Sequence, residues 1–84
     1  MATVAERVKK VTGELLEIDP ATISDDASFT VDLGAESVQS IELVAMFEEE
    51  FGVEMDEEAA LAVDTVSKAI EFVTQVCNEQ GVKV

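Results

Sequence analysis

Apolar residues recur at helical spacing through the middle of the chain. Between Gly34 and Gly52 the sequence has no glycine or proline, so nothing interrupts a helix over residues 37–51. Steps of about 100° per residue place five side chains on one stripe that we expect to face a core: Ser40, Leu43, Val44, Phe47 and Phe51. The opposite side mixes apolar and acidic side chains with one serine: Ser37, Val38, Ile41, Glu42, Ala45, Glu48 and Glu49. Because a solvated face is normally polar, this mixed face is a candidate functional surface.

Two further segments have the same period. The first follows a capping-box pattern, Thr3 to Glu6, and its apolar residues are Val4, Val8, Val11 and Leu15. The last follows Asp64 or Thr65 as the cap, and its apolar residues are Val66, Ala69, Ile70, Val73 and Cys77. Asp56 is a suitable cap for a short helix over residues 57–61. The pattern therefore predicts an all-α fold, a small four-helix bundle with three main helices and a short third helix.

The connection over residues 16–35 is long for a link between helices. Asp19-Pro20 ends the first helix, because proline lacks an N–H donor and restricts the residue before it. Apolar residues along the connection should anchor it to the bundle: Ile18, Ile23, Phe29, Val31 and Leu33. We expect a helical turn around residues 21–23, a core position for Phe29, and one domain over residues 1–84.

Charge is strongly negative and unevenly distributed. The chain has 19 acids against 5 bases, a net charge of −14, and residues 11–67 contain 16 of the acids and no base. Nucleic acid is excluded as a natural partner, because phosphate binding requires clustered Lys and Arg. Anionic membrane surfaces are disfavoured for the same reason. A partner with a basic patch is expected, although an acidic surface that merely keeps the chain solvated fits the same pattern.

The sequence lacks the residues that several kinds of catalytic and binding site require. The chain has no histidine, and its four glycines are scattered, so neither a histidine-based triad nor a phosphate loop can form. Residues 25–36 have the length of a calcium loop, but Ala27, Phe29 and Thr30 occupy positions that need ligands or glycine. A single cysteine forms no internal disulfide and suits a reducing cytosol; we expect Cys77 to be buried rather than reactive. No apolar run is long enough to span a membrane, and no secretory signal is evident.

The segment around Ser37 carries a family resemblance. DLGAESV at residues 32–38, IEL at 41–43 and EEEFG at 48–52 resemble the acyl carrier protein family in its discrete form, with shorter matches at residues 6–11, 27–29 and 65–66. The family's Asp-Ser-Leu triplet carries 4′-phosphopantetheine on its serine. The resemblance implies this cofactor on Ser37, attached by a phosphopantetheinyl transferase. It implies a carrier and no enzyme, one that moves acyl thioesters between enzymes of fatty-acid, lipid or polyketide-type biosynthesis in the cytoplasm as a monomer.

Two surfaces follow from the resemblance. The docking face, which would meet basic patches of partner enzymes, comprises Glu36, Val38, Ile41, Glu42, Ala45, Glu48 and Glu49. The acyl-pocket residues, which would shelter the cargo, are Phe29, Ser40, Val44, Phe47, Met55, Ala60, Val63 and Ile70. Spacing alone makes Ser37 an ordinary helix cap and the acyl-pocket residues ordinary core.

The chain departs from the family pattern at several positions. Glu36 and Val38 replace the Asp and Leu of the triplet, Ala45 stands where a bulkier residue is common, and Leu61 and Ala62 replace charged residues. These changes fit a specialised carrier at least as readily as a general fatty-acid carrier. Two other functions stay open: a carrier fold that has lost modification and acts as a structural or regulatory subunit, and a small acidic partner protein.

Overall fold

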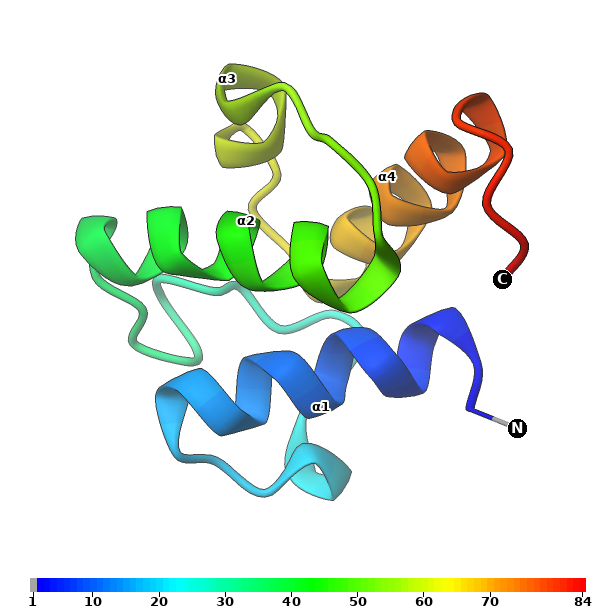
Figure 1. The fold of residues 1–84 in the computed structure, drawn as a ribbon. Helices are drawn as coiled ribbons and strands as arrows, with labels where there is room; N and C mark the ends of the chain where they lie inside the picture. The colour runs from blue at the N-terminus through cyan, green and yellow to red at the C-terminus, as the bar shows by residue number, and fades with distance from the viewer. Residues whose placement is uncertain (1) are drawn as a thin grey trace.

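Four α-helices and one 3₁₀ turn make up the structure, a computed structural model that describes residues 2–84 (Figure 1). Met1, the first residue of the expected domain, lies outside the described residues. The elements are α1 (Val4–Leu16), η1 (Pro20–Thr22), α2 (Ser37–Phe51), α3 (Glu57–Leu61) and α4 (Val66–Glu79). The all-α prediction is confirmed. α3 lies on the opposite side of α2 from α1.

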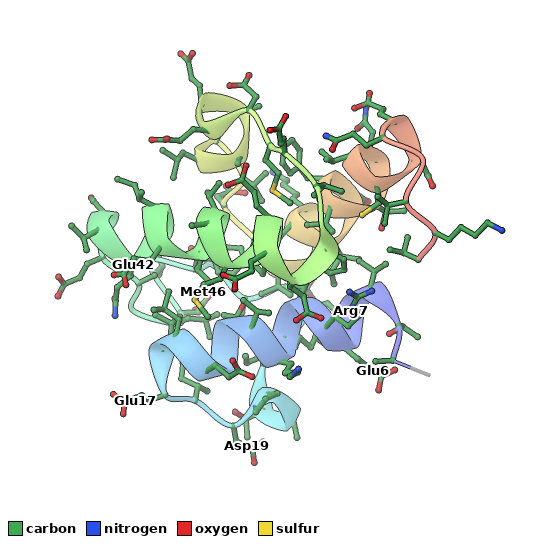
Figure 2. The ribbon with its side chains drawn as sticks, in the orientation of Figure 1. Glu6, Arg7, Glu17, Asp19, Glu42 and Met46 are labelled. Carbon is green, nitrogen blue, oxygen red and sulfur yellow. The ribbon has the colours of Figure 1, made fainter. Side chains whose placement is uncertain are left out.

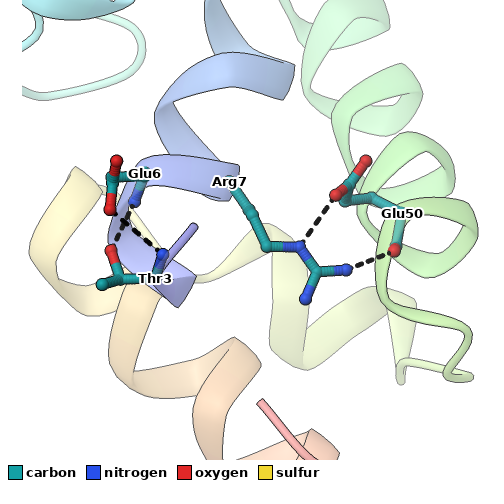
Figure 3. Close-up of polar contacts among 4 residues, drawn as sticks. All are labelled: Thr3, Glu6, Arg7 and Glu50. Carbon is teal, nitrogen blue, oxygen red and sulfur yellow. Dashed lines mark hydrogen bonds and ion pairs between the residues drawn. The ribbon is translucent and has the colours of Figure 1, made fainter. Parts of the chain in front are cut away.

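The helix ends follow local sequence signals. Thr3 Oγ1 accepts a hydrogen bond from the Glu6 N–H, and Glu6 Oε1 accepts one from the Thr3 N–H, both at 3.1 Å, which confirms the capping box (Figure 3). Thr65 caps α4 by accepting from the Lys68 N–H. α2 ends at Gly52, whose φ of 67° is a left-handed conformation that glycine adopts without strain. The chain thereby turns from α2 toward α3.

The core lies where α1, α2 and α4 meet. Its largest contributions from α2 are Leu43, Val44, Phe47 and Phe51, all buried as the stripe predicts, whereas Ser40 is half-buried. Other buried side chains come from α1 and α4: Val8, Val11, Val66, Ala69, Val73, Val76 and Cys77. Val82 packs on this core and donates its N–H to the Cys77 carbonyl at 2.8 Å, so the segment after α4 is held down at Val82.

The long connection wraps the bundle, as predicted, but one anchor is wrong. Ile23 and Phe29 are buried, and Ile18 and Leu33 pack partly against the core. Val31 is 82% exposed. Its N–H bonds to Ser28 Oγ in a tight turn, and this turn carries the Val31 side chain to the outside.

Backbone hydrogen bonds also tie this connection to the start of α4. The Phe29 N–H donates to the Asp64 carbonyl at 3.0 Å, and the Val66 N–H donates to the Ala27 carbonyl at 3.0 Å. The Ser67 N–H donates to the Asp25 carbonyl at 2.8 Å. These bonds satisfy buried backbone groups of an otherwise irregular segment. They fix the connection against α4 and lead it to the start of α2.

Arg7 joins the start of α1 to the end of α2 (Figures 2 and 3). Its Nε donates to Glu50 Oε2 at 2.9 Å, and its Nη2 donates to the Glu50 carbonyl at 2.8 Å. That carbonyl is among the last four of α2, which have no partner within the helix. The guanidinium also lies 4.3 Å from the centre of the Phe51 ring. One side chain thus caps a helix, pairs an acid and covers an aromatic residue.

Replacing Arg7 with methionine should lower the free energy of unfolding by about 2–3 kcal/mol, because two charge-assisted hydrogen bonds of a half-buried group are lost. Arg7→Lys should recover only part of this loss, since one ammonium cannot reproduce the planar pair of donors. Urea denaturation of the three proteins measures both effects. A methionine variant within about 0.5 kcal/mol of wild type would contradict the assigned role.

Cys77 is fully buried in α4, as predicted. Burial raises the pKa of its thiol above the ordinary value of 9.0, and the Arg7 guanidinium lowers it by a smaller amount. The folded chain therefore holds the thiol proton more tightly than the unfolded chain does. Stability from this group is fully present below pH 9 and declines as the pH rises toward the folded-state pKa.

Two measurements test this assignment. A thiol reagent at neutral pH should label Cys77 only as fast as the chain unfolds. The stability of wild type relative to Cys77→Val should fall as the pH rises above 9, because only the wild type has a thiol to ionise on unfolding. Fast labelling of the native protein, or a constant difference over this range, would show that the thiol is accessible.

None of the helices within residues 2–84 combines the length and apolar character needed to cross a membrane.

Candidate functional site

Ser37 is the first residue of α2 and is exposed. The helix cap is Glu36, not Ser37, which corrects the alternative based on spacing alone. Gln39 completes the cap, because its Oε1 accepts the Glu36 N–H at 3.0 Å. Within residues 2–84 the Ser37 hydroxyl has no hydrogen-bond partner. The hydroxyl is therefore accessible and has no structural bond to lose on modification.

The surroundings of Ser37 suit a phosphodiester. The first amides of a helix lack intrahelical partners, and the helix dipole favours negative charge at this end. No side chain activates the hydroxyl, since it contacts no acceptor within the described residues and the chain has no histidine. The residues present thus fit an attached phosphate, while the base for an attachment reaction must come from another protein.

The predicted docking face is mostly exposed, and it runs along α2 beside Ser37. Val38 is 65% exposed and Ile41 is 48% exposed, and the two lie three residues apart on one face of α2. Four further members are exposed: Glu36, Glu42, Ala45 and Glu49. Figure 2 shows Glu42 on this helix, with Met46 one turn further along toward α1. Glu48 differs because it is half-buried and its Oε2 accepts the Met55 N–H at 2.8 Å.

A cavity of about 130 Å³ lies between α2, α3, α4 and the long connection. Seven of the eight acyl-pocket residues line it: Phe29, Ser40, Val44, Phe47, Met55, Ala60 and Val63. Seven more lining residues were not predicted: Thr30, Leu43, Leu61, Asp64, Ala69, Phe72 and Val73. The cavity is mainly apolar, and Ser40 stands one helical turn from Ser37.

Ile70 is not among the residues that line this cavity; it is half-buried and packs on the core. Ala69, Phe72 and Val73 face the cavity from α4 instead. At about 100° per residue, Ile70 lies about 60° beyond Val73, on the side away from Phe72. The helical stripe was wide enough to include Ile70, but only the position of α3 decides which part of the stripe faces the cavity.

A second, more polar groove lies between α1 and α2. Its volume is about 400 Å³, and its lining residues are Val11, Glu14, Met46, Glu49 and Glu50. Glu49 therefore belongs both to the docking face and to the rim of this groove. Glu14 of α1 consequently lies close to the docking face, although the two residues are distant in sequence.

Residues 6–80 match the family described as "Phosphopantetheine attachment site". The chain is also 44% identical over 75 residues to an acyl carrier protein of Caulobacter vibrioides, covering 89% of this chain and 96% of the relative. The chain belongs to the acyl carrier protein family. Acyl carrier proteins of Sinorhizobium fredii and Rhizobium meliloti are each 48% identical over 73 residues, which cover 87% of this chain and 94% of the relative.

Membership of the acyl carrier protein family confirms two predictions. The cofactor is 4′-phosphopantetheine, and the role is that of an acyl carrier. This role is favoured over a carrier fold that has lost its modification. Relatives of this kind are carriers that work with biosynthetic enzymes.

Proposed function

We propose that Ser37 is the residue that bears 4′-phosphopantetheine. The proposal rests on a comparison of the exposure and hydrogen bonds of the five serines. Ser24 and Ser28 each accept a backbone hydrogen bond through their hydroxyls, and Ser67 lies within hydrogen-bond distance of Thr65. Ser40 is half-buried against the cavity. Ser37 alone among them is exposed at the start of a helix with a hydroxyl that has no partner in the described chain.

This chain plays a limited role in the attachment reaction. Ser37 Oγ attacks the pyrophosphate of coenzyme A at the phosphorus next to the pantetheine, the bridging P–O bond breaks, and 3′,5′-adenosine bisphosphate leaves. The hydroxyl proton passes to a base of the phosphopantetheinyl transferase, because the chain supplies none at Ser37. When bound, the group supplies a flexible thiol that holds acyl groups as thioesters. The chain itself presents the hydroxyl and a recognition surface, and catalyses nothing.

The docking face supports repeated, short-lived encounters with enzymes that carry basic patches. Exposed ion pairs each contribute about 0.2–1 kcal/mol and weaken with salt. Several such pairs around Val38, Ile41 and Ala45 give fast association and fast release. A carrier needs both, because it must leave one enzyme before it reaches the next. The charge pattern supports a monomer that meets one enzyme at a time.

The cavity supports a sheltered cargo. A void of about 150 Å³ lined by apolar side chains holds a molecule the size of benzene. The cavity of about 130 Å³ is somewhat smaller than this void, which supports a cargo of about six carbons at most without rearrangement. Each buried methylene contributes about 0.8 kcal/mol, which offsets the cost of ordering the chain. Longer acyl groups require the α3 side of the cavity to move outward.

The pathway we propose is acyl assembly of the fatty-acid, lipid or polyketide type in the cytoplasm, with residues 1–84 acting as one carrier domain. Val38 and Ala45 make the docking face smaller than is common in the family, which supports a specialised set of partner enzymes. The acyl group found on the protein purified from its own cells would identify the pathway.

Incubation with coenzyme A and a broad-specificity phosphopantetheinyl transferase tests the proposed function. The intact mass should rise by one phosphopantetheinyl group, and fragmentation should place it on Ser37. An unchanged mass, with a control carrier modified in the same tube, would favour a regulatory subunit or an acidic partner protein over the proposed function.

A further inference from the structure

The α3 side of the cavity is formed by a short segment that is largely exposed. α3 has five residues, and none of them is buried. It lies above α2 in Figure 1, away from α1. Nevertheless α3 and the residues beside it supply four lining side chains: Met55, Ala60, Leu61 and Val63. Whatever holds this segment against α2 therefore determines how closed the cavity is.

Glu48 holds the segment at the residue where it enters the cavity wall. Glu48 Oε2 accepts the Met55 N–H at 2.8 Å, and this bond is partly buried. Met55 lines the cavity and lies two residues before the start of α3. The adjacent residue, Glu54, is tied to α4, because its N–H donates to Gln80 Oε1 at 3.0 Å and its carbonyl accepts from Gln80 Nε2. The hydrogen bond between Glu48 and the Met55 N–H links this segment to α2.

We propose that Glu48 is a positioning residue that links docking to release of the cargo. The carboxylate that keeps Met55 in the cavity wall also belongs to the docking face, whose other acids are exposed. A partner's Lys or Arg draws this half-buried carboxylate outward and weakens its bond to the Met55 amide. The α3 segment then loosens, and the cavity opens when an enzyme is bound. This inference rests on the proposed docking face and on attachment at Ser37.

Two variants distinguish the effect of the hydrogen bond between Glu48 and the Met55 N–H from the effect of the Glu48 charge. Glu48→Gln keeps an acceptor oxygen at the same reach but removes the charge, whereas Glu48→Met keeps the length and removes the acceptor. In the unmodified chain, hydrogen exchange of the Met55 amide should be about tenfold faster in Glu48→Met and within about threefold of wild type in Glu48→Gln. Glu71→Gln, an exposed acid on α4, controls for net charge and should match wild type. Equal exchange in Glu48→Met and wild type would overturn the proposal.

The loaded carrier gives an independent readout. With a hexanoyl thioester on each protein, cleavage by hydroxylamine should be several-fold faster in Glu48→Met and unchanged in Glu48→Gln. Transfer of the acyl group to an enzyme should be slower in Glu48→Gln, through kcat/KM, because docking charge is lost. If the protein gains no mass from the transferase, the proposed function is wrong. If it loads normally and cleavage is equal in Glu48→Met and wild type, only this inference is wrong.

The link to docking is tested without any cargo. In the Ser37→Ala chain, which offers no hydroxyl at this position, a saturating amount of phosphopantetheinyl transferase should accelerate exchange of the Met55 amide. With Glu48→Met added, exchange is already fast, and the transferase should change it little. If the bound transferase leaves Met55 exchange unchanged in the Ser37→Ala chain, Glu48 holds the segment without any link to docking and the proposal is wrong.

Discussion

Replacing Ser37 with alanine is expected to abolish phosphopantetheinylation completely, because no other serine within residues 2–84 is both exposed and at the start of an α-helix. The loss should be all-or-none at the level of intact mass. Neither longer incubation nor more transferase should restore it, since the acceptor oxygen is absent. Ser37 is exposed and its hydroxyl has no partner within residues 2–84, so the stability of the variant should lie within about 0.5 kcal/mol of wild type.

The control is Ser40→Ala, which removes a hydroxyl one helical turn away at the cavity wall. This variant should gain the same mass as wild type. A mass gain that persists in Ser37→Ala would place the cofactor on another residue and would contradict the proposed site. Melting curves of both variants show that a lost modification is not a lost fold.

Reversing Glu42 and Glu49 to lysine is expected to slow modification and acyl transfer by about ten- to a hundredfold, mainly through a lower rate of encounter. The two residues are seven apart, both are exposed, and they share a side of α2. The buried stripe of the helix is untouched and the net charge falls in magnitude, so the fold should persist. Wild-type rates should decline with added salt, because salt screens the same attraction.

A matched control must change charge equally at a distance from the docking face. Glu14 is unsuitable, because it lines the same groove as Glu49. Glu71 and Glu79 are exposed acids on α4, and their reversal to lysine changes the net charge by the same amount. If both double variants slow transfer to the same degree, overall charge governs the encounter, and α2 is not the recognition surface. Initial rates at two salt concentrations measure both.

Elements controlled by neighbouring residues were predictable from the sequence. Gly52 ends α2 because it adopts a left-handed conformation, and Asp56 and Thr65 begin α3 and α4 as caps, so these boundaries follow from local chemistry. The family resemblance added the cofactor and the carrier role, neither of which periodicity could supply. Ser37 combined both sources, since its place at the helix start comes from the pattern and its proposed role from the resemblance.

Features that depend on distant contacts were not predictable. Val31 is apolar, yet the turn around Ser28 exposes it. The backbone bonds between residues 25–29 and 64–67 join segments far apart in the chain. The hydrogen bond that the Met55 N–H donates to Glu48 spans only seven residues, yet it too was not predicted, and it ties a predicted surface acid to a residue of the cavity wall. No periodicity contains this information, because each bond depends on how the whole bundle packs.

The contacts of Arg7 with Glu50 and Phe51 affect how the docking face can change during evolution. They hold the C-terminal end of α2, about 20 Å along the helix from Ser37. The fold is thus fastened at the C-terminal end of α2, whereas the proposed attachment site, Ser37, lies at the other end. Substitution of an exposed residue such as Val38 then costs little stability, because its side chain does not support the core. A lineage can exchange one set of enzymes for another by altering exposed residues, without repairing the scaffold at each step.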